Sequence, residues 1–191
     1  MSHSAGRFSY TGPGETGGNW QIYFFVHAPA NANLDLDTKN GPVSIADVSG
    51  VIKLRAANGP LAIRNCTGNI DAQTTNGPIS FNGDAGEVHL HAHNGPIAVK
   101  LSQDTWNGSQ LEAQTENGPV SLKLPATFRS GVRIESDGNA PISCKMCGTP
   151  VARQSSGPRT MQMNGTSGTV RVSTHNGPIS VSNANGKERA L

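Results

Sequence analysis

Aromatic and charged side chains are scarce in this sequence. Aromatic residues make up 5% of the 191 residues, and Asp, Glu, Lys and Arg together make up 15%, whereas charged residues average about 25% in globular domains. The longest uninterrupted apolar run, residues 22–26, is far shorter than the roughly 20 residues that cross a bilayer. The composition therefore predicts a narrow core, and the sequence predicts no transmembrane segment in this chain.

A concentrated positive charge is also missing. The 15 Lys and Arg residues are nearly balanced by 13 Asp and Glu residues, which leaves a net charge of +2 and no basic block. This balance argues against a nucleic-acid partner, because such proteins carry a strongly basic patch. The first residues lack the basic and apolar regions of a secretory signal peptide. We therefore expect either a cytosolic protein or a fragment of a longer precursor.

What the sequence does contain is an internal repeat built around Asn-Gly-Pro. The first three intervals between these tripeptides are each 18 residues, and the later ones are of similar length. We interpret the Asn residues as structural turns, because Asn and Gly tolerate left-handed conformations and Pro fixes φ at the start of the next strand. Stacked Asn side chains can also bond to one another. The predicted turn residues are Asn40, Asn58, Asn76, Asn94, Asn117, Asn176 and, in an Asn-Ala-Pro variant, Asn139.

Apolar residues alternate on both sides of each turn. They occupy the sixth and fourth positions before each Asn, as at Ile70 and Ala72, and the third and fifth positions after it, as at Ile79 and Phe81. This period of two predicts a longer strand, the Asn-Gly-Pro corner, a shorter strand and a second corner at a Gly such as Gly50 or Gly68.

Two all-β folds accommodate such a unit, an antiparallel barrel and a parallel solenoid. Five residues before each Asn, successive repeats carry Asp35, Lys53, Asp71, His89 and Glu112. Alternating charges of this kind attract only if equivalent strands stack in register, which favours the solenoid. We expect a single-domain, all-β parallel β-helix (β-solenoid) of about eight coils. Residues 1–28 would form an N-terminal cap strand or junction, residues 29–182 the solenoid and residues 183–191 a flexible tail.

The recurring unit apolar-x-apolar-x-Thr-x-Asn-Gly-Pro-apolar-Ser-apolar resembles a bacterial adhesin-type family of β-strand-repeat proteins. The resemblance runs from about His27 to Ser182 and includes the segment Leu124-Pro-Ala126. It implies a right-handed parallel β-helix, an extracytoplasmic location (periplasmic, cell-surface or secreted) and no established catalytic residues. The missing export signal agrees with this location only if the chain is a fragment.

Three histidines lie at alternate positions of one predicted strand, His89, His91 and His93. Their side chains would project from the same outward face, about 6.5 to 7 Å apart between successive Cα atoms. Imidazoles at this spacing can converge on a divalent metal, with Glu112 or Glu116 of the next coil adding a carboxylate. The alternative is a solvated strand face, and we expect no resident cofactor.

Cys144 and Cys147 have the spacing of a disulfide, a redox pair or half a zinc site. Cys144 occupies an apolar position of the repeat, so buried thiols are a further interpretation. An exported protein would be expected to form the bridge between them.

Enzymatic activity is not expected. Parallel β-helices include polysaccharide-cleaving enzymes, which use paired carboxylates, and Asp35 with Asp37 or Asp71 with Glu112 are candidate pairs. The alternating ladder accounts for these residues through Lys53, Arg55 and His89. The sequence therefore favours a non-catalytic adhesion, binding or scaffold module with a protein or glycan partner at the cell envelope. The alternatives are a ligand-sensing ectodomain of an envelope signalling protein and a carbohydrate-active β-helix.

Overall fold

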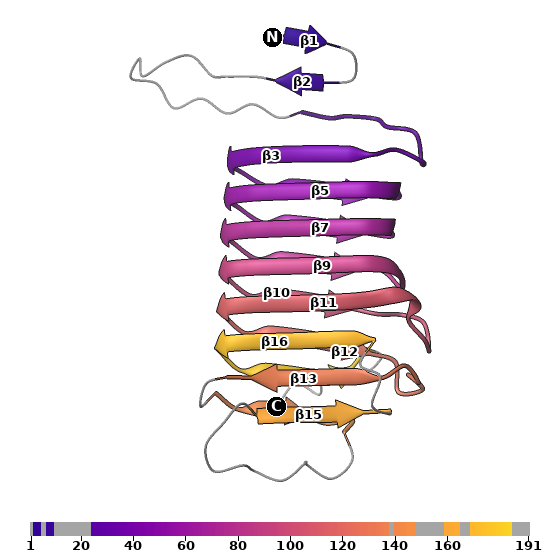
Figure 1. Cartoon of the computed structure of the whole chain (residues 1–191), viewed down its shortest axis with the longest axis vertical. Coiled ribbons are helices and arrows are strands. Elements are labelled where there is room, and N and C mark those ends of the chain that lie inside the picture. The colour runs from indigo at the N-terminus through magenta and orange to yellow at the C-terminus, as the bar shows by residue number, and fades with distance from the viewer. Residues whose placement is uncertain are drawn as a thin grey trace, which may run out of the picture.

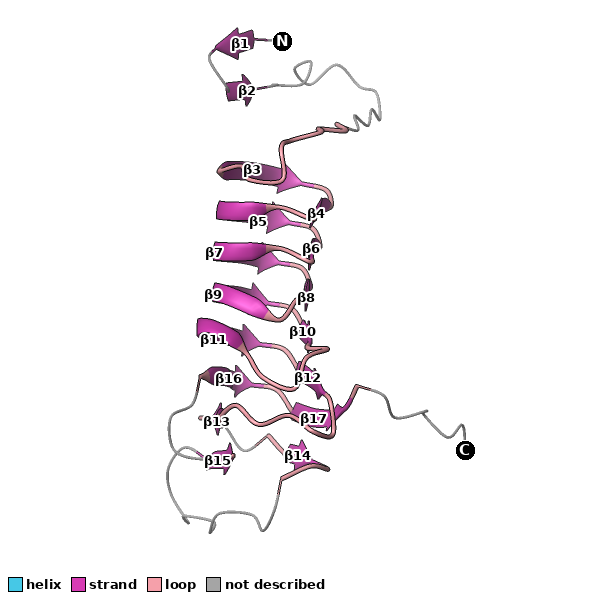
Figure 2. Cartoon of the chain, turned by 90° about the vertical axis from the view of Figure 1, so that its right-hand side faces the viewer, coloured by secondary structure: helices cyan, strands magenta, loops and turns pink. Residues whose placement is uncertain are grey.

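The computed structural model describes residues 2–4, 7–9, 24–137, 140–147, 159–164 and 169–184. Most of these residues form two sheets that face each other across a narrow core and build a rod (Figures 1 and 2). Each coil contributes one strand to each sheet, so we call the two sheets the long-strand sheet and the short-strand sheet. Within these described ranges, no helix is long and apolar enough to cross a membrane.

From β3 to β15 the strands alternate between the two sheets, and β16 follows β15 in the same sheet. The long-strand sheet contains β3 (Leu34–Asn40), β5 (Ser49–Asn58), β7 (Thr67–Asn76), β9 (Ala85–Asn94), β11 (Asn107–Asn117), β13 (Val132–Ser136), β15 (Arg159–Met163) and β16 (Val170–Asn176). The short-strand sheet contains β4 (Val43–Ala46), β6 (Leu61–Arg64), β8 (Ile79–Asn82), β10 (Ile97–Lys100), β12 (Val120–Leu124), β14 (Ile142–Cys144) and β17 (Ile179–Asn183). A separate antiparallel pair is formed by β1 (Ser2–Ser4) and β2 (Arg7–Ser9).

The parallel register confirms the solenoid and excludes the barrel. Ile70 pairs with Val88, the residue 18 positions later, and the same offset relates β3 to β5 and β5 to β7. In the long-strand sheet, eight strands stack in the described residues. Seven of them belong to coils with a short strand, and the eighth, β15, pairs antiparallel with β13. The expected count of about eight coils is thus seven coils and one additional strand.

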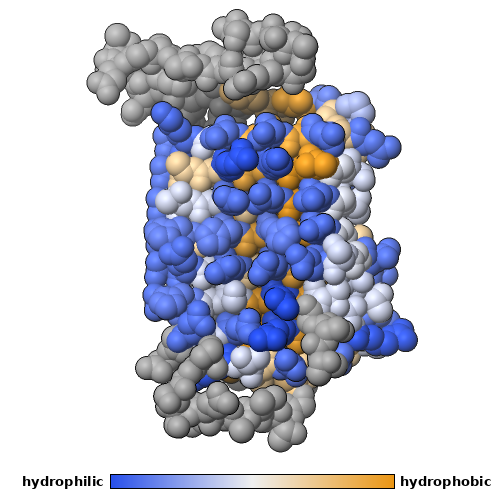
Figure 3. All heavy atoms as spheres, in the orientation of Figure 1, coloured by the Kyte–Doolittle hydropathy of each residue, from blue (hydrophilic) through white to orange (hydrophobic). Residues whose placement is uncertain are grey.

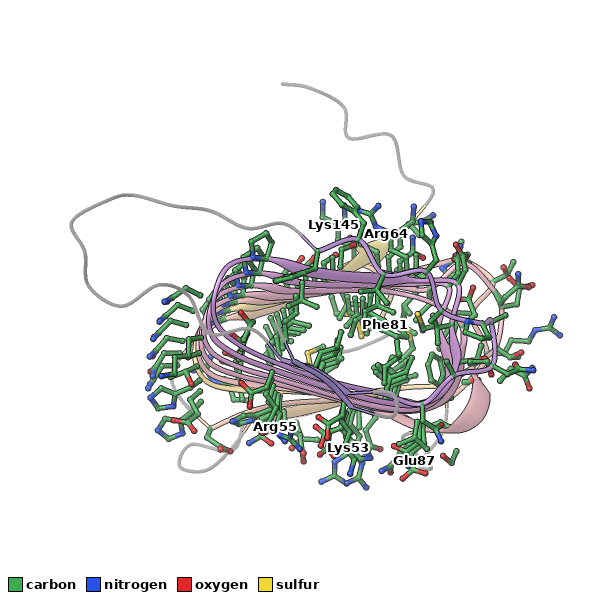
Figure 4. All side chains as sticks on the ribbon, turned by 90° about the horizontal axis from the view of Figure 1, so that it is seen from above. Lys53, Arg55, Arg64, Phe81, Glu87 and Lys145 are labelled. Atoms are coloured by element: carbon green, nitrogen blue, oxygen red, sulfur yellow. A yellow bond between two sulfur atoms is a disulfide. The ribbon has the colours of Figure 1, made fainter. Side chains whose placement is uncertain are left out.

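The apolar columns of the repeat form the core. Ile52, Ile70 and Val88 are fully buried in the long-strand sheet, and Ile79 and Phe81 are buried in the opposite sheet. Phe81 points into the space between the sheets when the rod is viewed along its axis (Figure 4). Burial of this continuous apolar surface is the main favourable contribution to folding.

The Asn-Gly-Pro corners stack into a ladder along one edge of the rod. The side-chain amide of each Asn donates to the amide oxygen of the Asn in the neighbouring coil, and all five bonds measure 3.0 Å. The ladder contains Asn40, Asn58, Asn76, Asn94, Asn117 and Asn176 in that order. Asn139 lies outside the described residues. Threonines two residues before the Asn add bonds to glycine carbonyls, as from Thr115 Oγ1 to Gly95 O at 2.9 Å.

The order of the coils in the rod differs from their order in the sequence. Strand β16 lies between β11 and β13, and β17 lies between β12 and β14 (Figure 1). Val170 therefore pairs with Leu111 on one side and with Val132 on the other. We call β16 and β17 the inserted coil. At this end the stack departs from sequence order, because the segment after β12 skips one level before it forms β13.

The repeats that begin at Asn94 and Asn117 are longer than 18 residues, and their additional residues form two loops near the inserted coil. Residues 101–106 and 125–131 form loops that contact each other, with Arg129 N donating to Asp104 O at 2.7 Å and Trp106 N to Ser130 Oγ at 2.9 Å. Leu101, Trp106 and Phe128 are buried with the core. These two loops close one side of the rod where the chain bypasses the level of the inserted coil.

The second corner also differs from the expectation. Gly50 and Gly68 lie inside β5 and β7, not before them. The turn begins earlier, at Asp47 and Asn65, whose φ values are 60° and 50°, and Gly50 and Gly68 follow with φ values of 142° and 101°. Asn65 Nδ2 donates to Asp47 Oδ1 at 3.2 Å, which continues the stacking of polar corners on this side.

The expected domain division includes residues that the structure does not describe. The parallel strands extend from Leu34 to Asn183. Ahead of them, the segment at residues 30–32 already contacts β5, because Ser49 N donates to Ala30 O and Ala32 N donates to Ser49 O. Most of the expected cap segment and of the expected tail lies outside the described residues.

Candidate functional site

The outward face of the long-strand sheet carries the alternating charges. Asp35, Lys53, Asp71, His89 and Glu112 are in register on five adjacent strands, as the sequence predicts. Hydrophilic side chains cover most of this face (Figure 3). At the start of the ladder the ion pair is diagonal, however, and joins Arg55 Nη1 to Asp35 Oδ1 at 3.1 Å. Since its groups are largely exposed, this ladder contributes little stability.

The candidate pairs of carboxylates lie beside basic groups on this face. His89 lies between Asp71 and Glu112 in the stack, so these two carboxylates are not neighbours. Asp35 is bound by Arg55. The expected compensation of these groups by basic neighbours is therefore present for Asp35 and Glu112, which contact Arg55 and His89 respectively.

The three histidines of β9 face carboxylates of β11. His89 Nδ1 lies 3.3 Å from Glu112 Oε2, and His93 Nδ1 lies 2.6 Å from Glu116 Oε2. His91 Nε2 lies 3.9 Å from the other oxygen of Glu116. Among the described residues no group of three His, Cys, Asp or Glu side chains is placed to hold a metal ion. His91 and His93 share Glu116, while His89 lies beside Glu112, and the metal site expected from the three histidines stays a prediction.

Two of the three cysteines form a disulfide. The Sγ atoms of Cys144 and Cys147 are 2.04 Å apart, and both residues pack against the end of the core. A zinc half-site and a pair of free thiols therefore do not describe these residues in this structure. Cys66 is a free, fully buried cysteine next to the corner that follows β6.

The buried thiol of Cys66 gives a simple test of core packing. Burial raises the pKa of this thiol, so the reactive thiolate is scarce at neutral pH. We expect one thiol per chain to react with a disulfide reagent in denaturant, and the same thiol to react at least about tenfold more slowly in the native protein. Absorbance of the released chromophore measures both rates. Rapid reaction in the native protein would contradict the burial of Cys66.

The outward face of the short-strand sheet has a different character. Seven short strands present small residues in one column, in stack order Ser44, Ala62, Ser80, Ala98, Ser121, Ser180 and Ser143. The parallel column two residues later contains four cations, Arg64, Lys100, Lys123 and Lys145. We call these four residues the basic column. No Asp or Glu lies in these seven strands, whereas the long-strand sheet carries seven of them.

The basic column is exposed and electrostatically uncompensated. Its four side chains are classed as exposed, and none of them forms an ion pair with another described residue. Arg64 and Lys145 project from one broad side of the rod, and Lys53, Arg55 and Glu87 project from the opposite side (Figure 4). The nearly neutral chain therefore separates its charges: the short strands of one broad side carry cations and no acid, and the strands of the other side carry both.

A shallow hollow lies between the cations. It has a volume of about 230 Å³ and is lined by the side chains of Arg64, Lys100 and Lys123 together with Asn82, Ser80 and Ser121. This volume is below that of ordinary small-molecule pockets, about 300 to 1,000 Å³. The hollow has the polar donors of a binding surface but does not enclose a ligand.

Sequence reasoning missed this surface. All four cations occupy the sixth position after an Asn of the repeat, a column that the analysis of the third and fifth positions left out. The signal was present, since this column reads Ala46, Arg64, Asn82, Lys100, Lys123, Lys145 and Ser182 in sequence order and contains no acid. Only the strand register reveals that these residues are neighbours in space.

Comparison with known proteins places the repeats in one family. The family model described as Toastrack DUF4097 matches residues 26–146, which is more than half of the chain. No curated protein and no solved structure matches the sequence or the fold.

Proposed function

The chain belongs to the Toastrack DUF4097 family, and from that premise we propose that it is a non-catalytic, extracytoplasmic binding and scaffold module of a bacterial envelope. It attaches to an anionic envelope component through the outward face of its short-strand sheet. The repeat's resemblance to bacterial adhesin-type proteins supports the location and the adhesive role. The disulfide between Cys144 and Cys147 also supports an oxidising compartment.

The single observation that carries the proposal is the basic column. Arg64, Lys100, Lys123 and Lys145 lie on one face without a carboxylate among the outward residues of its strands. Such a face attracts anions over a Debye length of about 8 Å at physiological salt, whereas the mixed face opposite does not. A flat, open surface of this kind suits an extended partner better than a small substrate.

Cosedimentation with isolated bacterial envelope fragments tests this function. We expect the wild-type protein to sediment with the fragments at low salt and to be released as the salt concentration rises. A variant with the basic column replaced (Arg64→Gln, Lys100→Gln, Lys123→Gln and Lys145→Gln) should bind at least about tenfold more weakly.

The matched control removes four exposed cations outside the basic column, with the substitutions Lys39→Gln, Lys53→Gln, Arg129→Gln and Arg171→Gln. Both variants have the same net charge, so unspecific attraction changes equally in both. Retained binding by the control variant supports the proposal. Equal loss in both variants, or no loss in either, contradicts the role of the basic column.

A further inference from the structure

We propose that the basic column binds a linear, carboxylate-bearing polysaccharide that lies parallel to the axis of the rod. This inference rests on the proposed function, because it names the anionic component that the short-strand face would hold. It is carried by the order of the side chains along the stack, by the hollow between them and by the rise of the coils.

The cations have a defined spacing along the stack. From one coil to the next the column reads Arg64, Asn82, Lys100, Lys123, Ser182 and Lys145. Two cations therefore lie on adjacent coils in the centre, and each outer cation follows after one neutral position. With about 4.8 Å between strands, the six positions extend over about 24 Å. A ligand that meets all four cations must be extended and must run along the axis.

The neutral positions favour a sugar chain over other polyanions. Asn82 and Ser182 lie between the cations, and Ser80 and Ser121 lie beside them in the hollow. Amide and hydroxyl groups both donate to and accept from sugar hydroxyls. The outward positions of these strands carry no aromatic side chain, so they offer no platform on which nucleic-acid bases would stack.

The rise of the solenoid matches the ligand class. Each coil adds about 4.8 Å, which is close to the length that one hexose unit adds to a linear chain. A uronic-acid polymer of about six units would therefore span the column and could bring carboxylates near the four cations and hydroxyls near the neutral positions. Bound carboxylates would accept hydrogen bonds from Arg64, which offers a planar fork, and from the ammonium groups of the three lysines.

The experiment uses oligogalacturonates of increasing length as the probe, measured by calorimetry at low salt. We expect the affinity to increase with each added unit up to about six units, the number of coils in the column, and to level off beyond that length. Methyl-esterified oligomers of the same length, which have lost the carboxylate charge, should bind at least about 20-fold more weakly.

An isosteric pair of variants tests the position of the ligand. Asn82→Asp places a carboxylate between Arg64 and Lys100, and it should reduce the affinity at least about tenfold. Gln114→Glu adds the same charge on the exposed long-strand face and should leave the affinity within about twofold of wild type. Circular dichroism confirms that both variants retain the fold.

The outcomes separate this inference from the proposed function. If polyphosphate of equal charge binds as tightly as the oligogalacturonates, or if affinity does not depend on their length, the polysaccharide assignment is wrong. The envelope cosedimentation of the two fourfold variants then still decides the function. If the oligogalacturonates bind equally to the variant without the basic column, the inference is overturned, and the proposed function fails only if the envelope cosedimentation of that variant is also unchanged.

Discussion

Gly95→Ala is expected to lower the free energy of unfolding by about 3 kcal/mol, because the coils approach too closely for a side chain at the Asn-Gly-Pro corner. A Cβ atom at this position would lie 2.1 Å from the carbonyl oxygen of Gly77 and 2.7 Å from its carbonyl carbon. These are backbone atoms of the stacked corner, where Gly77 N donates to Asn94 O at 3.0 Å, so they cannot move without lengthening such hydrogen bonds. Urea denaturation followed by circular dichroism measures the loss.

Gly41 provides the control for backbone strain. It occupies the same corner in the first coil, where φ is +112° and a Cβ atom would meet nothing within 4 Å. Gly41→Ala should therefore cost only the strain of a left-handed conformation, about 1 kcal/mol. If both substitutions lower stability equally, close stacking of the coils is not what requires glycine at this corner.

Ile70→Asp should have the largest effect, a loss of at least about 4 kcal/mol. Ile70 is fully buried between the sheets, and its nearest strand partners on both sides are the buried Ile52 and Val88. The substitution would place a carboxylate where it has no cation and no water. We expect the variant to show little of the native β-sheet signal at temperatures where the wild type is folded.

The neighbouring residue is the matched control. Asp71 projects from the opposite face of the same strand, where Gln73 Nε2 donates to its Oδ1 at 3.0 Å. Asp71→Asn should change the free energy of unfolding by about 1 kcal/mol or less, because the pair is at the surface. Equal effects of the two substitutions in thermal melts would mean that the inward and outward faces of β7 are interchanged.

The repeat predicted the local structure and the register well. Alternation around each Asn placed Ile70 and Val88 in the core, and the constant interval of 18 residues placed them side by side. The burial depends on the apolar pattern within one repeat, and the register depends on the equal length of neighbouring repeats. Both are visible in a single sequence. They fix the register because a shift by one residue would move all the apolar side chains of a strand to the solvent face.

The order of the coils and the basic column could not be predicted in the same way. The strand from Val170 to Asn176 has the same pattern as every other long strand, so its sequence does not state between which neighbours it lies. Arg64 and Lys145 are likewise 81 residues apart in the chain. A composition with a net charge of +2 conceals a basic face that only the stacking assembles.

The position of the inserted coil also determines when the strand pairing of the solenoid can be completed during synthesis. Until residues 169–184 have left the ribosome, β13 and β14 lack the parallel partners that separate them from β11 and β12. The growing chain would therefore carry two open sheet edges facing an empty level, and such edges pair readily with other chains. The inserted coil is synthesised after both of its neighbours and must pair with strands on each side of it. Its loss would open the rod internally, and not merely shorten it by one level.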